Sequence, residues 1–186
     1  MSGGIRGVLP ALSFAAVNRA GRAGYVAGLQ RHHLLPRVLV GQRCFARLIE
    51  AIGATAAFED FRRNGMLLPA TEWAAVRMGL PLHRGPHGTY SAMVGERLGG
   101  IETGWASERR KDGEAAGLYA MRALAALQAD LRRSLLDPRR TVLLNRSDPL
   151  GSGTDFTAID AMAETLWGAT QRPNGAVLAE SAAIAA

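Results

Sequence analysis

All four histidines of the chain fall into two close pairs, and an asparagine lies between the pairs. His32 and His33 are adjacent in QRHHLLPRVL, His83 and His87 are four residues apart in LHRGPHGTY, and Asn64 lies in FRRNGMLLP. Neutral imidazole coordinates divalent metals, and with a pKa of about 6.5 it is also the natural general base near neutral pH. The two pairs could therefore supply two or three metal ligands and one base.

Each pair taken alone is better explained by ordinary histidines. Adjacent residues of a strand point to opposite faces, so one of His32 and His33 could be exposed and the other a core residue. Residues four apart share a helical face, but Pro86 belongs in a first helical turn, which places His83 in a loop and His87 at a helix start. The combination of both pairs with Asn64 is what favours chemistry.

Hydrophobic periodicity and turn residues predict the elements that position these side chains. The sequence predicts a short strand ended by Pro36 and a brief strand over 66–68 after an Asn-Gly turn. It predicts helices over about 11–20, 43–52, 71–79, 86–98, 114–136 and 158–167. Within the helix over 114–136 we expect an apolar stripe of Leu118, Met121, Leu124, Leu127, Leu131 and Leu135. We also expect Trp73 and Tyr90 to pack in the core. The fold class is mostly α with a small amount of β.

Composition sets limits on the kind of protein. A chain of 186 residues with 48% hydrophobic and 20% charged residues is long enough for one domain with a real core. The net charge is +6, and all but one of the 22 basic residues are arginine, which permits binding of a polyanion such as nucleic acid. Arginine pairs over 109–110, 132–133 and 139–140 could contact its backbone.

Cysteine usage and hydropathy bear on the compartment. Cys44 is the single cysteine, which excludes an intramolecular disulfide and a multi-thiolate zinc site and favours the cytoplasm. The apolar run over 8–17 is interrupted by Pro10 and lacks a cleavage site, so we expect no signal peptide. No run reaches the length of a membrane span, and no membrane partner is expected.

The order His-His, Asn, His-x-x-x-His resembles the HNH nucleases. The segments QRHHLLPRVL, FRRNGMLLP and LPLHRGPHGTYSAMVGERL are similar to the AHH branch of the HNH and endonuclease VII superfamily, over residues 24 to 98. Such members carry a double histidine before an apolar-Pro segment, an Asn-Gly before a short Leu-Pro strand, and a late histidine pair near a tyrosine. The branch is named for an alanine before the double histidine, where this chain has Arg31.

The resemblance implies a ββα-metal (His-Me finger) nuclease core over 24–100, an N-terminal extension over 1–23 and a helical C-terminal extension over 101–186. It implies that one divalent ion, Mg, Mn, Ni or Zn, is held by His32, His83 and His87. The pattern of colicin-type DNases makes His33 the general base, although the roles of the two adjacent histidines stay open from sequence. Asn64 is expected to hold the second strand or to orient the base. A backbone carbonyl or the Asn64 amide would fix the tautomer of His33.

The implied function is metal-dependent endonucleolytic cleavage of nucleic acid, with DNA favoured over RNA. Arg31 and Arg84 are candidate phosphate contacts, because a guanidinium can bind phosphate oxygens in a fork. The partner is nucleic acid, and an immunity or regulatory protein would join it if the enzyme were a toxin; we expect a free-standing enzyme.

The alternative is a non-catalytic nucleic-acid-binding module whose histidines hold a structural zinc. Structural zinc sites close all four positions and usually use cysteines, so His33 would then also be a ligand. If the enzyme is correct, His32, His33, Asn64, His83 and His87 must converge within about one metal coordination sphere and its second shell, and a His32 far from His83 and His87 would contradict it. The strand must then bulge or turn between Arg31 and Pro36 to bring both adjacent histidines to it.

Overall fold

The computed structural model describes residues 10–53, 55–137, 139, 144–145 and 147–150, and this part of the chain is mostly helical with one two-stranded antiparallel sheet, as predicted. The elements in chain order are η1 (Phe14–Ala16), β1 (Leu29–His33), α1 (Arg37–Val40), α2 (Arg43–Ala51), α3 (Thr55–Glu59), α4 (Phe61–Asn64), β2 (Gly65–Pro69), α5 (Glu72–Met78), α6 (Gly88–Arg109) and α7 (Gly113–Leu136). The helix predicted over 158–167 lies outside the described residues. None of the helices in the described ranges combines the length and the hydropathy that a membrane crossing requires.

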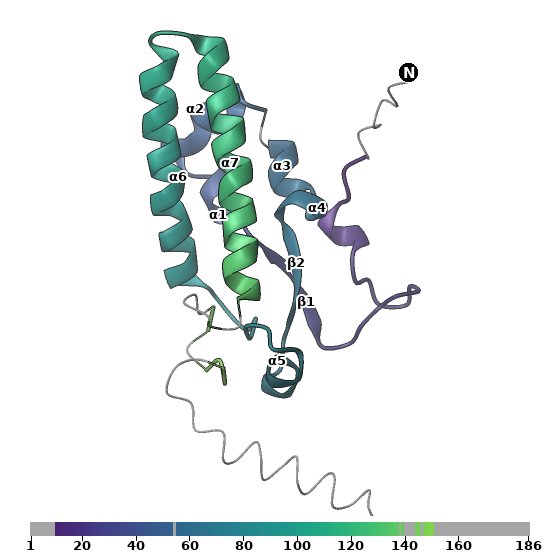
Figure 1. Cartoon of the computed structure of the whole chain (residues 1–186). Coiled ribbons are helices and arrows are strands. Elements are labelled where there is room, and N and C mark those ends of the chain that lie inside the picture. Colours follow the sequence, from purple (N-terminus) through teal and green to yellow (C-terminus); the bar gives the residue numbers. More distant parts are fainter. Residues whose placement is uncertain (1–9, 54, 138, 140–143, 146, 151–186) are drawn as a thin grey trace, which may run out of the picture. The chain divides into compact units, whose positions relative to one another are not determined.

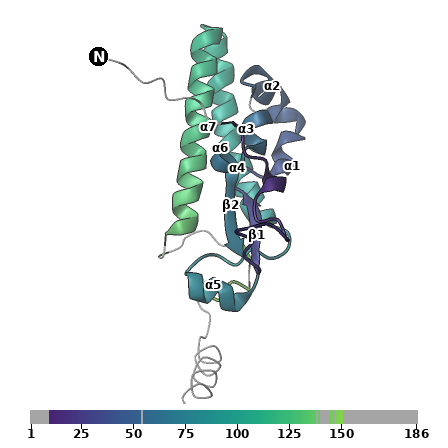
Figure 2. The same cartoon turned by 90° about the vertical axis from the view of Figure 1, so that its right-hand side faces the viewer.

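The hairpin of β1 and β2 has an unbroken register that reaches His33, which lies opposite Gly65. Because side chains alternate along a strand, Gln30 and His32 project to one face of the hairpin, and Arg31 and His33 to the other. In both views the two strands lie beside the helical layer, with α5 at one end of the hairpin (Figures 1 and 2). The hairpin therefore presents two chemically different faces.

The helices α6 and α7 form a long antiparallel pair joined by a short turn (Figure 1). The Asp112 carboxylate begins α7 by accepting hydrogen bonds from the backbone N–H groups of residues 114 and 115. The two helices approach closely at Gly104, where a Cβ would overlap the side chain of Tyr119. The observed α6 is longer than the predicted helix over 86–98. Its extension buries Ile101 and Trp105, which continue the apolar spacing past the glycines at 99–100.

Three sequence predictions about buried faces are wrong. Leu118 and Met121 of α7 are 45% and 47% exposed, and Trp73 of α5 is 60% exposed with the Arg77 guanidinium over its ring. The rest of the predicted stripe, Leu124, Leu127, Leu131 and Leu135, is buried as expected. In the first half of α7 the buried face carries the small residues Ala116 and Ala120, which let α6 approach closely, and Gln128 is buried farther along.

The helix predicted over 11–20 is also wrong, because that segment forms only the short turn η1. Its internal hydrogen bonds are confined to this turn, and the backbone of Leu12 is bonded to distant residues instead: the Leu12 N–H donates to the Asp60 carboxylate at 3.0 Å, and the Phe61 N–H donates to the Leu12 carbonyl at 2.7 Å. Ser13 and Asp60 also form an isolated antiparallel bridge. Tertiary hydrogen bonds thus replace helical ones here.

Asn64 is fully buried at the junction of α4 and β2. Its side-chain oxygen accepts from the Leu35 N–H at 2.7 Å, and its amide nitrogen donates to the carbonyls of Leu35 at 3.1 Å and Phe58 at 3.0 Å. The Asn64 backbone carbonyl accepts from the Leu34 N–H at 2.8 Å. One side chain therefore ties the segment that follows the double histidine to the start of β2 and to α3.

We expect Asn64→Ala to lower the free energy of unfolding by about 3–5 kcal/mol, because it leaves three buried backbone groups without partners. Urea denaturation of the metal-free protein measures the loss. The matched control is Arg63→Ala, the exposed neighbour in α4, for which we expect a change within about 0.5 kcal/mol. A loss for Asn64→Ala no larger than that of the control would contradict the assigned role.

Candidate active site

The three histidines predicted as metal ligands lie together at one end of the hairpin. His32 comes from β1, His83 from the loop after α5, and His87 from the N-cap of α6. Their ring centroids are 5.0 Å apart for His32 and His83, 5.6 Å for His32 and His87, and 4.5 Å for His83 and His87. One ring nitrogen from each lies within 4.8 Å of the others. We call these three residues the histidine triad.

Backbone hydrogen bonds fix the loop that carries the second and third members of the triad. The His83 N–H donates to the Pro69 carbonyl at 2.7 Å, which joins the loop to the end of β2. The Leu82 N–H donates to the carboxylate of the buried Asp148 at 3.0 Å. At the other end, the His87 carbonyl accepts the first helical hydrogen bond of α6, from the Ser91 N–H at 2.8 Å.

Hydrogen bonds also set which ring nitrogen of His83 and of His87, the two outer members of the triad, is left without a hydrogen. The Nδ1 of His87 is 3.0 Å from the Leu144 carbonyl, and because a carbonyl only accepts, Nδ1 carries the hydrogen. The Nδ1 of His83 is 3.1 Å from Oε1 of Gln30, which sets the same tautomer. The Nε2 atoms of both rings then keep their lone pairs for a metal.

His32, the buried member of the triad, shows whether a metal fits this site. His32 is 3% exposed, and its Nε2 is buried without a hydrogen-bond partner among the described residues. A buried polar atom without a partner is rare and costly in a protein. A divalent ion at the centre of the triad would satisfy that atom together with the free nitrogens of His83 and His87. The donor set therefore fits a divalent metal.

The environment keeps His32 and His83 neutral at pH 7. Burial, followed by repulsion from His83 and His87, lowers the pKa of His32 to about 2. Burial, followed by repulsion from His87, lowers the pKa of His83 to about 4. Imidazole binds a metal only in its neutral form, so protons do not compete for these two ligands near neutral pH.

These shifts predict that the metal-free protein loses stability in mild acid. The folded-state pKa values of His32 and His83 lie below the unfolded value of about 6.5, so the unfolded chain binds more protons as the pH falls. Stability is therefore full above pH 6.5 and declines below it, approaching about 1.4 kcal/mol per pH unit for each histidine. Urea midpoints measured in EDTA between pH 7 and 5 test this. A slope that His83→Gln leaves unchanged would contradict it.

The model of one protein family matches this chain over residues 13–130. The family is described as AHH, a nuclease family of the HNH/ENDO VII superfamily with conserved AHH. This chain belongs to the AHH nuclease family. No match was found among the curated proteins or among the solved structures. Membership makes the protein a nuclease whose substrate is nucleic acid, and the helical fold with a hairpin and three clustered histidines is compatible with a ββα-metal core.

The AHH triplet of the family is Arg31-His32-His33 in this member, and its last residue lies apart from the triad. The register is unbroken to His33, and the chain bends only at residues 34–35, beyond both histidines. The predicted bulge that would bring both rings to one face is therefore wrong. The ring of His33 instead stacks on that of Phe14, with centroids 3.6 Å apart and planes within 5°.

The electrostatic surroundings of His33 differ from those of the triad. Burial lowers its pKa; Glu59 opposes that shift, and Arg37 and Arg31 add to it. Glu59 is itself paired with Arg37 at 3.1 Å on the surface. The Asn64 amide, expected as one way to fix the His33 tautomer, bonds instead to the backbone of Leu35 and Phe58.

The two arginines expected to contact phosphate have different surroundings in this AHH member. The Arg31 guanidinium donates to the carbonyl of Phe14 at 2.8 Å and to that of Val17 at 3.5 Å, so it is engaged within the chain. Arg84 has an exposed side chain between the two outer triad members, and its carbonyl accepts from the Asn145 side-chain amide. Contact with phosphate stays a prediction for both, and Arg84 is the freer of the two.

Two contributors to the site, Gln30 and the Leu144 carbonyl, were missed from sequence, whereas the core position of Tyr90 was predicted. Gln30 lies two residues before His32 and so shares its face of β1, a signal that period-two alternation offers. The hydroxyl of Tyr90 donates to the Leu34 carbonyl at 2.7 Å, while its ring packs 5.1 Å from that of His32, in the core as predicted. The Leu144 carbonyl is a backbone group, which no residue pattern identifies.

Gln30→Ala should weaken metal binding by about 10- to 100-fold, because His83 loses the acceptor that fixes its tautomer. Isothermal titration with Zn²⁺ or Ni²⁺ measures the affinity. Gln30→Glu keeps an acceptor at the same place and is the matched control, with affinity close to that of the unsubstituted protein. Equal loss in both variants would show that the tautomer is not the cause.

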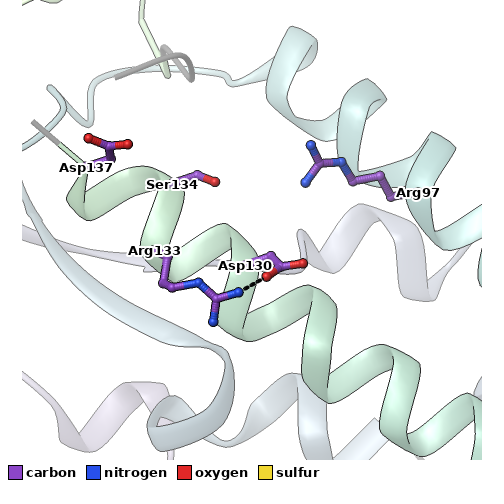
Figure 3. A pocket seen from close by; sticks show the side chains of 5 residues that line it. All are labelled: Arg97, Asp130, Arg133, Ser134 and Asp137. Atoms are coloured by element: carbon purple, nitrogen blue, oxygen red, sulfur yellow. Dashed lines mark hydrogen bonds and ion pairs between the residues drawn. The ribbon is translucent and has the colours of Figure 1, made fainter. Parts of the chain in front are cut away.

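A pocket between α6 and α7 contains none of the predicted site residues (Figure 3). Its lining residues are Arg97, Asp130, Arg133, Ser134 and Asp137. Arg133 pairs with Asp130, and the neighbouring Arg132 donates to the carbonyls of Arg62, Arg63 and Gly65. The mixed charge makes this pocket a poor phosphate site, and the arginine pair over 132–133 has structural partners.

Proposed function

We propose that this AHH-family nuclease is a metal-dependent endonuclease that hydrolyses phosphodiester bonds in DNA. In this proposal His32, His83 and His87 hold one divalent ion, and His33 is the general base. The observation that carries the proposal is the convergence of three imidazole nitrogens within 4.8 Å, with the fourth histidine of the chain next to one of them in sequence.

In this proposal the metal and the base act from the two faces of β1, and His33 is near enough to the triad to lower the pKa of His32 and of His83. When bound, a divalent ion supplies stabilisation of the negative charge that grows on the phosphate and on the leaving oxygen. The triad binds and orients that ion through neutral imidazoles. His33, whose pKa is lowered by burial, is neutral at pH 7. Its Nε2 is buried, so in this proposal its Nδ1 accepts the proton of the attacking water. Asn64 holds the segment after His33 in place and is a positioning residue in this proposal.

The charge distribution supports a polyanionic substrate. The chain carries a net charge of +6, which attracts nucleic acid over long range. In this proposal the exposed Arg84, between His83 and His87 in the chain, contacts a phosphate oxygen beside the triad. Its replacement would then raise KM more than it lowers kcat, and the effect would shrink at high salt.

A closed structural zinc site has less support. A structural zinc uses four protein ligands, whereas the described residues bring together three side chains capable of holding a metal. His33, the fourth ligand that this alternative requires, lies on the other face of β1 and stacks on Phe14. A centre with three protein ligands leaves a coordination position for water or substrate, which is the arrangement of a catalytic metal.

The test is cleavage of a substrate without ends. Supercoiled plasmid, a transcribed RNA and single-stranded DNA are each incubated with the purified protein and Mg²⁺, Mn²⁺, Ni²⁺ or Zn²⁺, beside a reaction in EDTA. We expect nicked and linear plasmid with at least one metal and none in EDTA. Metal binding without cleavage of any substrate would overturn the proposal, and cleavage of RNA alone would overturn its preference for DNA.

A further inference from the structure

The face of the hairpin opposite the triad carries a stack of aromatic rings that ends on His33. A Cβ at Gly65, the residue opposite His33, would overlap the ring of Phe61, so glycine at that position lets the Phe61 ring pack against β2. The edge of Phe14 meets Phe61 with centroids 5.0 Å apart and planes at 74°, and Phe14 stacks on His33 at 3.6 Å. The His33 imidazole therefore packs against a cluster of two aromatic rings.

Hydrogen bonds from three directions hold Phe14 in this place. Leu12, two residues before it, is bonded to Asp60 and Phe61 through its N–H and carbonyl. The Phe14 carbonyl itself accepts from the Arg31 guanidinium at 2.8 Å. Arg31 lies two residues before His33 on the same strand, so both side chains reach the same face. The residue that departs from the AHH pattern therefore holds the ring that stacks on His33.

Among the described residues, His33 has no hydrogen bond that would fix its ring. Its Nε2 is buried and has no partner, and the Asn64 amide is bonded elsewhere. A general base has to keep its ring in a productive orientation, and a neighbouring carboxylate or carbonyl usually does this. Here the Phe14 ring, 9% exposed and parallel to the imidazole, is the group in contact with it.

We propose that Phe14 is a positioning residue for His33, and that Arg31 acts through Phe14 by clamping its carbonyl. The proposal rests on the proposed function in one respect, the role of His33 as the base. The turn η1, which the sequence assigned to an extension before the core, is then part of the catalytic apparatus. It fixes the plane of the base on one face of β1 while the triad holds the metal on the other.

The first test compares Phe14→Leu, which removes the ring, with Phe14→Tyr, which keeps it. We expect Phe14→Leu to lower kcat by about 3- to 10-fold with KM unchanged, and Phe14→Tyr to restore it. A higher kcat for Phe14→Leu would overturn the proposal, because the ring would then be an obstruction to the substrate. An unchanged kcat would overturn it too.

The second test measures the stacking of His33 on Phe14 by NMR, independently of catalysis. In protein labelled at its four histidines, the ring-proton signals of His33 are assigned by their loss in His33→Ala. Stacking on Phe14 shifts them upfield; Phe14→Leu should remove that shift, and Phe14→Tyr should retain it. If the unsubstituted protein shows the shift but cleaves nothing, the proposed function fails, and this inference fails with it. If it cleaves and Phe14→Leu cleaves equally, only the positioning role fails.

Arg31→Ala separates clamping from phosphate binding. A clamp predicts a lower kcat, an unchanged KM and a moved His33 signal, with an effect that does not add to that of Phe14→Leu. A direct phosphate contact predicts a higher KM and additivity, and it would overturn the clamp. Affinity for Ni²⁺ in each variant reports whether the triad is intact, and circular dichroism reports whether the chain is folded.

Discussion

His33→Ala should lower kcat for plasmid cleavage by about 10²- to 10⁴-fold while leaving metal affinity unchanged. The proposed function makes this the loss of a general base: without it the attacking water keeps its proton until bulk solvent removes it. Metal affinity is unaffected because His33 stacks on Phe14, on the face of β1 opposite the triad. Single-turnover cleavage measures the rate, and titration with Ni²⁺ measures the affinity.

Two further observations sharpen the His33 prediction. Added imidazole should restore part of the activity of His33→Ala, since the small molecule can occupy the space left and accept the proton. Thermal unfolding should remain cooperative, because the removed ring is only half-buried. Cleavage at the unsubstituted rate would mean that another group is the base, and a loss of metal affinity would mean that His33 belongs to the metal centre.

His32→Ala should abolish metal binding and cleavage together. Removing one of three imidazole ligands should weaken metal affinity by more than about 100-fold, beyond the effect of losing an orienting group. Because His32 is 3% exposed, its removal also leaves a buried cavity, and loss of activity could follow from unfolding alone. The half-buried His83 provides a second variant, His83→Ala, in which the cavity is smaller.

The adjacent pair forms its own control. His32→Ala and His33→Ala remove the same side chain at neighbouring positions of one strand, yet the first should lose metal and the second should keep it. Titration with Ni²⁺, with cleavage measured at saturating metal, distinguishes them. If both variants lose metal equally, or if His83→Ala binds metal normally while folded, the assignment of the triad is incorrect.

Local signals predicted the elements whose ends are marked by their own residues. Thr71 accepts from the Ala74 N–H at the start of α5, and Gly79 ends that helix with a positive φ of 62°. The apolar spacing of residues 43–52 predicted α2, and the apolar run over 66–68 predicted β2. The predicted Asn-Gly turn is wrong, because Asn64 ends α4 and Gly65, with an extended φ of −110°, begins β2. The sequence did not predict elements whose conformation depends on hydrogen bonds to residues far away in the chain. The segment over 11–20 is apolar enough for a helix, but Asp60 and Phe61 take its backbone hydrogen bonds.

The site was predictable to the extent that residue type reveals chemistry. Histidine is rare in this chain, so its pairing pointed to His32, His83 and His87, and the structure brings these three together. The alternation of β1 was visible in the sequence as well, since it raised the question of how adjacent histidines could serve one site. The sequence did not reveal that His33 has an environment of its own. Its ring stacks on Phe14, which belongs to a segment whose fold depends on tertiary contacts.

The hydrogen bond between His87 and the Leu144 carbonyl sets a lower limit on the length of a minimal enzyme. The family match ends at residue 130, yet residues 144–148 supply an acceptor to His87 and a carboxylate to the Leu82 N–H. A fragment trimmed to the matched region would keep all four histidines and lose the group that selects the His87 tautomer. Shortening this nuclease for fusion to another protein should therefore stop no earlier than residue 150.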